Sequence, residues 1–127
     1  MISSSSRGSG SRKLEKPVVL FRSLSTLVSA GVPIHRSLEL LADSSENEND
    51  QFILRQLCLD VSRGKTLSVG MSKFSQAFSD YIVSLIRVGE KTGALVTILE
   101  TIAEHSEKSD EIRLKMRSAL VLSLIHI

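Results

Sequence analysis

The chain has no tryptophan, one tyrosine, one cysteine and two prolines among its 127 residues. The single cysteine, Cys58, excludes an internal disulfide bond and suits a reducing compartment. No segment approaches the roughly 20 apolar residues that span a bilayer, and Met1–Arg12 lacks the apolar stretch of a signal peptide. Because aromatic residues make up only 4% of the chain, leucine, isoleucine and valine must supply the buried surface. This composition predicts a single all-α domain.

Catalytic motifs are also missing. The sequence contains no glycine-rich phosphate loop, no zinc-ligand spacing and no nucleophile elbow. His35 and His105 fall in different predicted helices, away from Cys58. The acid-rich stretch that begins at Asp43 resembles a calcium loop, but Glu48 stands where that loop requires glycine. We therefore expect no catalytic residue, no organic cofactor and no enzymatic activity.

The positive charge is concentrated at the start of the chain. Residues 1–16 carry four basic side chains against one acid, a net charge of +3, whereas the whole chain carries +2. The remainder is thus close to neutral, which gives no electrostatic reason to expect nucleic-acid binding. Residues 1–12 are rich in serine and glycine, a composition that cannot bury enough apolar surface to fold. We expect residues 1–16 to form a disordered leader before a domain at 17–121.

Apolar residues recur at helical spacing through residues 17–121 and predict six helices. The first starts at Pro17 and ends at Ala30-Gly31, and a second starts at once at Pro33. A loop is expected over Asp43–Asp50, with Asp50 as the N-cap of the third helix. The other predicted boundaries are Gly64 at the end of the third helix, Leu67–Ser72 for the fourth, Asp80 or Ser79 at the start of the fifth, and Ala94 near the start of the sixth. The fold class is therefore an all-α, six-helix bundle of antiparallel helices.

A tight corner joins the last two predicted helices, at Gly89-Glu90-Lys91-Thr92-Gly93. Gly89 is predicted to end one helix and Gly93 to permit a close start of the next. Glu90 has two interpretations that the sequence leaves open. It caps the helix that follows, or it lies on a surface that contacts a second copy or a partner, with a divalent cation such as calcium as a possible ligand.

The sixth predicted helix changes character along its length. From Glu104 to Lys115 it is almost entirely polar, with acid–base pairs at helical spacing, and we expect it to be long and to project from the bundle. Residues 122–127 are interpreted as a tail that is not native. Leu122–Ile127 is what CTG-TCT-CTT-ATA-CAC-ATC encodes, a transposon end used as a sequencing adapter, and the alternative is the start of a missing membrane segment.

Several of these motifs occur in an order that resembles a known family. They are Phe21-x-x-Leu24-x-x-Leu27 followed by Ala30-Gly31-Val32-Pro33, then Gly64-Lys65-Thr66-Leu67-Ser68, then Gly89-Glu90-x-x-Gly93-Ala94-Leu95. This pattern resembles the cytoplasmic F domain of type II secretion system protein F and its type IV pilus counterpart, over about residues 18–121. The residues that carry the motif are Gly31, Pro33, Gly64, Gly89, Glu90, Gly93 and Leu95.

The resemblance implies a non-catalytic platform on the cytoplasmic face of the bacterial inner membrane, within a longer multi-pass membrane protein. The expected partners are a second copy of the domain, the assembly ATPase, other inner-membrane components and pilin-like subunits. In this family the platform couples the ATPase to pilin assembly and protein secretion. The alternative is a free helical adaptor or dimerisation module in bacterial signalling.

Overall fold

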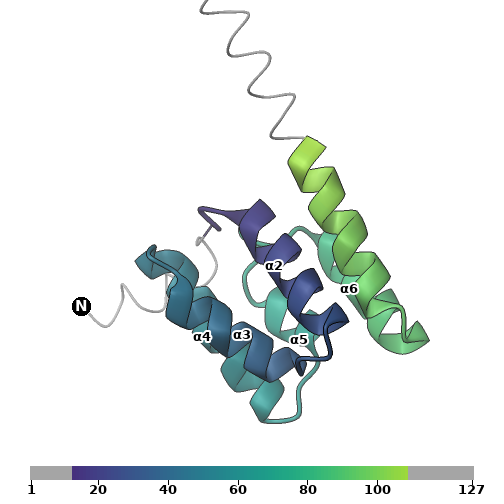
Figure 1. Cartoon of the computed structure of the whole chain (residues 1–127), viewed down its shortest axis with the longest axis horizontal. Helices are drawn as coiled ribbons and strands as arrows, with labels where there is room; N and C mark the ends of the chain where they lie inside the picture. Colours follow the sequence, from purple (N-terminus) through teal and green to yellow (C-terminus); the bar gives the residue numbers. More distant parts are fainter. Residues whose placement is uncertain (1–12, 109–127) are drawn as a thin grey trace, which may run out of the picture.

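The computed structural model describes residues 13–108 of the chain (Figure 1). These residues contain helices and no strand, which confirms the all-α class. The labelled helices are α2 (Pro17–Ser29), α3 (Ile34–Ser44), α4 (Glu48–Ser62), α5 (Leu67–Ser72) and α6 (Asp80–Thr92). The chain is helical again from residue 95 to residue 108. The predicted leader residues 1–12 and the tail 122–127 lie outside the described residues.

Neighbouring helices in the sequence pack against one another in space. α3 contacts α2 and α4, and α5 contacts α4 and α6. In Figure 1, α2 lies between α3 and the light-green helix of residues 95–108. All of these elements contribute to one apolar core, whose buried members are Leu20, Phe21, Leu24, Leu38, Ala42, Ile53, Leu54, Leu57, Leu67, Met71, Phe74, Phe78, Val83, Ile86, Leu99, Ile102 and Ala103.

Three of the four phenylalanine side chains are buried in this core. Phe74 and Phe78 lie in the segment between α5 and α6, and both rings are almost fully buried. Phe78 makes an edge-to-face contact with Phe21 of α2, with ring centroids 6.1 Å apart. Phe74 makes the same kind of contact with Phe52 of α4 at 6.3 Å. These geometries are favourable for aromatic quadrupoles. The irregular segment between α5 and α6 is thus packed against both α2 and α4.

Most predicted helix boundaries are confirmed. Gly31 and Gly64 have positive φ and follow the helices that they were predicted to end, and Pro33 is the N-cap of α3. The Ser79 hydroxyl accepts a hydrogen bond from the Ile82 N–H, so Ser79 rather than Asp80 caps α6.

The predicted loop at Asp43–Asp50 is wrong in its length and in its cap. α3 continues to Ser44 and α4 begins at Glu48, so only residues 45–47 separate the two helices. Asn47 is the N-cap of α4, and its side-chain oxygen accepts from the Asp50 N–H at 2.9 Å. Asp50 instead lies in the first turn of the helix. Asp and Asn are both good N-cap residues, so the sequence alone did not decide between Asn47 and Asp50.

Two features of the predicted fold class are not tested here. The antiparallel arrangement stays a prediction, and the long last helix can be followed only to residue 108. Within residues 13–108, none of the helices has the length and apolarity that crossing a bilayer requires.

Candidate functional site

The predicted corner is formed one turn later than expected. α6 runs through Gly89 and ends at Thr92, and Gly93 adopts a left-handed conformation with φ of 76°. The Gly89 carbonyl accepts the N–H groups of both Gly93 and Ala94, the latter at 3.0 Å. Gly93 is therefore the helix stop, because a side chain at that φ is strained. The prediction that Gly89 ends the helix is wrong.

Gly89 lies inside α6 at a close contact with the following helix. A Cβ atom at this position would lie 3.0 Å from Cγ1 of Ile98 and 3.1 Å from Cα of Leu95. Ordinary carbon–carbon contacts are about 3.5–4.0 Å. The missing side chain therefore allows the helix of residues 95–108 to cross α6 at close range. The close approach, rather than a turn, requires glycine here.

Glu90 caps a helix, but a different one from the helix predicted. Its Oε2 atom accepts the Leu67 N–H at 2.7 Å and the Ser68 N–H at 3.4 Å, at the start of α5. α5 has no acidic residue in its own first turn. The first N–H groups of a helix lack internal partners. The Thr66 hydroxyl accepts the Val69 N–H, and the half-buried Glu90 carboxylate from α6 is the acceptor for Leu67 and Ser68. That missing acid was the only sequence signal for this contact.

Asp50 also accepts backbone N–H groups from another part of the chain. Its side chain is 6% exposed. Its two oxygens accept the N–H groups of Glu15 at 2.7 Å and Lys16 at 3.1 Å. Residues 13–16, which the sequence assigns to the leader, therefore contact α4 just before α2 begins.

Asp60, near the end of α4, is equally buried and binds lysine side chains. Its carboxylate lies 2.9 Å from the Lys73 ammonium and 3.9 Å from that of Lys65. The hydrogen bond to Asp60 raises the pKa of Lys73 above its ordinary value. This contact holds the end of α5 to α4.

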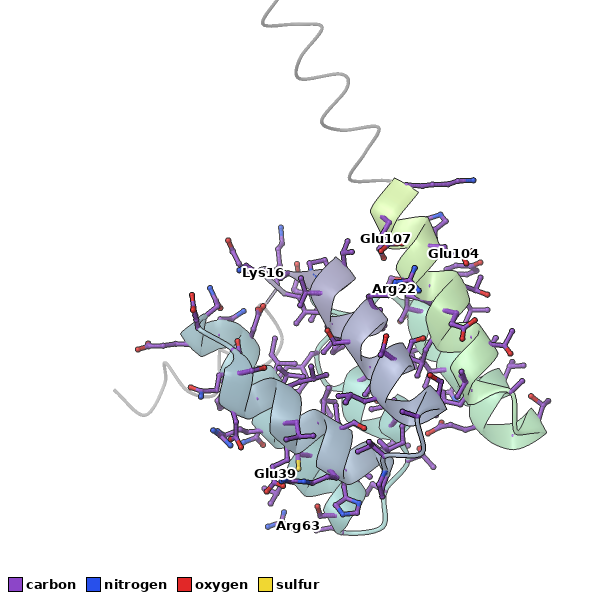
Figure 2. The ribbon with its side chains drawn as sticks, in the orientation of Figure 1. Lys16, Arg22, Glu39, Arg63, Glu104 and Glu107 are labelled. Atoms are coloured by element: carbon purple, nitrogen blue, oxygen red, sulfur yellow. The ribbon has the colours of Figure 1, made fainter. Side chains whose placement is uncertain are left out.

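Arg22 joins α2 to the last described turns of the chain. Its guanidinium donates to both carboxylate oxygens of Glu107, at 2.6 Å and 3.2 Å. Figure 2 shows the Arg22 side chain extending from α2 toward the helix that carries Glu104 and Glu107. The shared hydrogen bond raises the pKa of Arg22 and lowers the pKa of Glu107. The polar extension predicted from Glu104 onward is therefore tied to α2 at its start.

The remaining candidates for chemistry are dispersed. Cys58 is half-buried, and its thiol donates to the His35 carbonyl at 3.3 Å. His105 lies on the exposed side of the helix of residues 95–108. Among the described residues, no cluster of three or more His, Cys, Asp or Glu side chains could hold a metal ion. The prediction that Glu90 ligates a cation remains untested.

A small hollow lies between α6 and the helix of residues 95–108. It has a volume of about 150 Å³ and is lined by Ser79, Tyr81, Ile82, Leu85, Thr101, Ile102, His105 and Ser106. Its lining is largely apolar, its polar groups are hydroxyls and the His105 imidazole, and it includes no Asp, Glu, Lys or Arg side chain. The hollow therefore suits an apolar side chain better than an ion.

Comparison with known proteins gives a family match over most of the chain. The model described as "Type II secretion system (T2SS), protein F" matches residues 20–126. This range includes residues 122–126 of the predicted tail, which lie outside the described part of the chain.

The names of the curated relatives refer to two machines, the type IV pilus and the type II secretion system. The type IV pilus assembly protein PilC of Thermus thermophilus is 36% identical over 119 residues, covering 94% of this chain and 28% of that protein. The type IV pilus assembly protein TapC of Aeromonas hydrophila is 31% identical over 115 residues, covering 91% and 28%. The type II secretion system protein F of Vibrio cholerae is 29% identical over 107 residues, covering 84% and 26%. The chain thus spans little more than a quarter of the length of each of these relatives.

Proposed function

Because this chain belongs to the type II secretion system protein F family, we propose that it is a non-catalytic platform domain of a type II secretion or type IV pilus machine. The observation that carries the proposal is the family match over residues 20–126, with relatives named for both machines. The match favours a platform over the free signalling adaptor that the helical pattern alone also allowed.

We place the domain on the cytoplasmic face of the inner membrane, joined to membrane segments elsewhere in a longer protein. There it would couple the assembly ATPase to the movement of pilin-like subunits. The size of the relatives supports this context, because this chain corresponds to only part of each of them.

The internal polar contacts suit a domain that transmits force. Asp50, Asp60, Glu90 and Glu107 each connect two different elements of the described fold. A side chain engaged in this way holds two parts of the fold together. The domain would then act through its surfaces, as a rigid connector.

Self-association belongs to the same proposal. A second copy of the domain is an expected partner, and Glu90 with a divalent cation remains a candidate for that contact. Calcium titration of wild type and Glu90→Gln, followed by sedimentation, tests the cation prediction. Equal sedimentation of the two proteins with and without calcium would remove Glu90 and the cation from the proposal.

The platform role predicts binding without catalysis. The purified chain should bind the assembly ATPase of the same organism in biolayer interferometry, and it should not hydrolyse ATP by itself. Leu99→Asp, which places a charge at a fully buried position, serves as the unfolded control and should not bind. ATP hydrolysis by the chain, or equal signals from the wild type and the unfolded control, would contradict the proposal.

A further inference from the structure

The outward face of α6 carries an apolar row that the described part of the chain covers only at its middle residue. Tyr81 is 68% exposed and Val88 is 52% exposed, and Leu85 between them is half-buried. Their spacing of four and then three residues places them in one row along the helix. Tyr81 and Leu85 also border the hollow beside residues 95–108, so the row and the hollow form one apolar surface.

A second row of α6 residues runs beside the apolar one and carries charges in a fixed order. Asp80, Ser84, Arg87 and Lys91 follow one another at spacings of four, three and four residues, and all four are exposed. The acid is at the start of the helix and the two bases are near its end. Within residues 13–108, none of these three charged side chains forms an ion pair.

This order of charges makes the face complementary to itself. If a second α6 packs antiparallel, its Lys91 lies opposite Asp80 when the two-fold axis passes between residues 85 and 86. Tyr81 lies opposite Val88 of the second copy when the axis passes between residues 84 and 85. The two positions of the axis differ by one residue, so the two arrangements differ by a shift of one helix along the other of two residues, about 3 Å. The flexible four-carbon stem of Lys91 can span that shift. Both pairings therefore fit a single two-fold interface.

We propose that this face of α6, the α6 face, is the contact between two copies of the domain. It consists of Tyr81, Leu85 and Val88 with the flanking row from Asp80 to Lys91. The inference rests on the self-association included in the proposed function and gives it a location. Glu90 lies nine positions after Tyr81, on the opposite side of α6, where it holds α5. The α6 face and the predicted Glu90 site are thus different surfaces.

The size of the α6 face sets the strength of the contact. A helix of 13 residues is about 20 Å long, and one pair of such helices buries less than the roughly 1,200 Å² of a stable interface. We expect the isolated chain to dimerise weakly, with a Kd of about 0.1–1 mM. Anchoring two copies in one membrane machine raises their effective concentration and makes so weak a contact sufficient.

Sedimentation equilibrium of the full chain at increasing concentration measures the association. Val88→Asp should weaken it by at least about tenfold, because the contact would bury an unpaired carboxylate. Val19→Asp is the matched control, since Val19 is the same residue type, is 54% exposed and lies on α2. Circular dichroism melts confirm that both variants fold. Equal weakening by the two variants, or none by Val88→Asp, would overturn the location on α6.

A charge exchange tests the antiparallel arrangement. Asp80→Lys and Lys91→Asp should each weaken the dimer several-fold, and the double variant should restore it. Residues 80 and 91 are about 16 Å apart along one helix, so they cannot pair within one copy. Additive losses in the double variant would refute the arrangement. A chain that stays monomeric at millimolar concentration would refute the α6 face and self-association together but leave ATPase binding unaffected.

Discussion

Replacing Gly89 with alanine should destabilise the domain, although alanine is the better helix former. In an exposed helix interior the exchange would stabilise the fold by about 0.8–1 kcal/mol. Here the added methyl group would lie 3.0 Å from Ile98 and 3.1 Å from the Cα atom of Leu95. The Leu95 contact is with backbone, so relief requires a shift of the whole helix of residues 95–108.

Overpacking of this kind costs about 1–3 kcal/mol. After the gain in helix propensity is subtracted, we expect Gly89→Ala to lower the free energy of unfolding by about 1 kcal/mol. In a domain of this size that change corresponds to a fall in melting temperature of about 4 °C.

Gly70→Ala provides the matched control in α5. A Cβ atom there would lie 3.1 Å from Cδ2 of Leu57, the mobile end of a side chain, and its next contact, with Asp60, is an ordinary 3.5 Å. Because Leu57 can adjust its rotamer, Gly70→Ala should be neutral or slightly stabilising. Urea unfolding of wild type and both variants, followed by circular dichroism, measures the difference. A Gly89→Ala variant as stable as Gly70→Ala would show that the close crossing at Gly89 does not constrain the fold.

Glu90→Gln should cost about 1–2 kcal/mol of stability, because two backbone N–H groups lose a charged acceptor, and no loss in urea melts would contradict the cap on α5. Leu99→Asp should cost more than about 3 kcal/mol, since Leu99 is fully buried. Lys108→Ala on the polar part of the same helix should cost about 0.5 kcal/mol or less, so equal effects would mean that the helix faces are misassigned. The pKa of Glu107 is lowered by the hydrogen bond from Arg22, so its contribution to stability is present above the unfolded-state pKa and is lost as the pH falls through the folded-state pKa. Carboxyl NMR titration should show this low pKa, and Arg22→Gln should raise it.

The helices and their stops could be predicted because the signals are local. Pro17 and Pro33 suit helix starts, and the glycines at 31 and 64 permit the left-handed conformation that ends a helix. α2, α5 and the stop at Gly31 therefore lie where the sequence places them. The Asp43–Asp50 segment was predicted less well, because N-caps and first-turn acids are drawn from the same residue types and several positions in this segment could begin the helix.

The candidate site was predicted only in part. The sequence identified the corner from Gly89, Glu90 and Gly93, but it did not identify the structural role of each residue. Gly89 looks like a stop in the sequence because glycine disfavours helices, and only the position of Ile98 shows that it serves a helix crossing. The contact between Glu90 and Leu67 joins residues 23 positions apart, and no local pattern specifies such a pairing.

The sequence by itself determined the all-helical class, the helix boundaries that depend on proline and glycine, and the family to which the motif order points. Each depends on residues within a few positions of one another, or on their linear order. The tertiary structure alone decided which carboxylate meets which partner: Glu90 with α5, Asp50 with the entry to α2, Asp60 with Lys73, and Glu107 with Arg22. The reason is that a side chain's partner depends on where the packed core places the other helices. Many helix packings are compatible with the same local signals, and only the assembled fold selects among them.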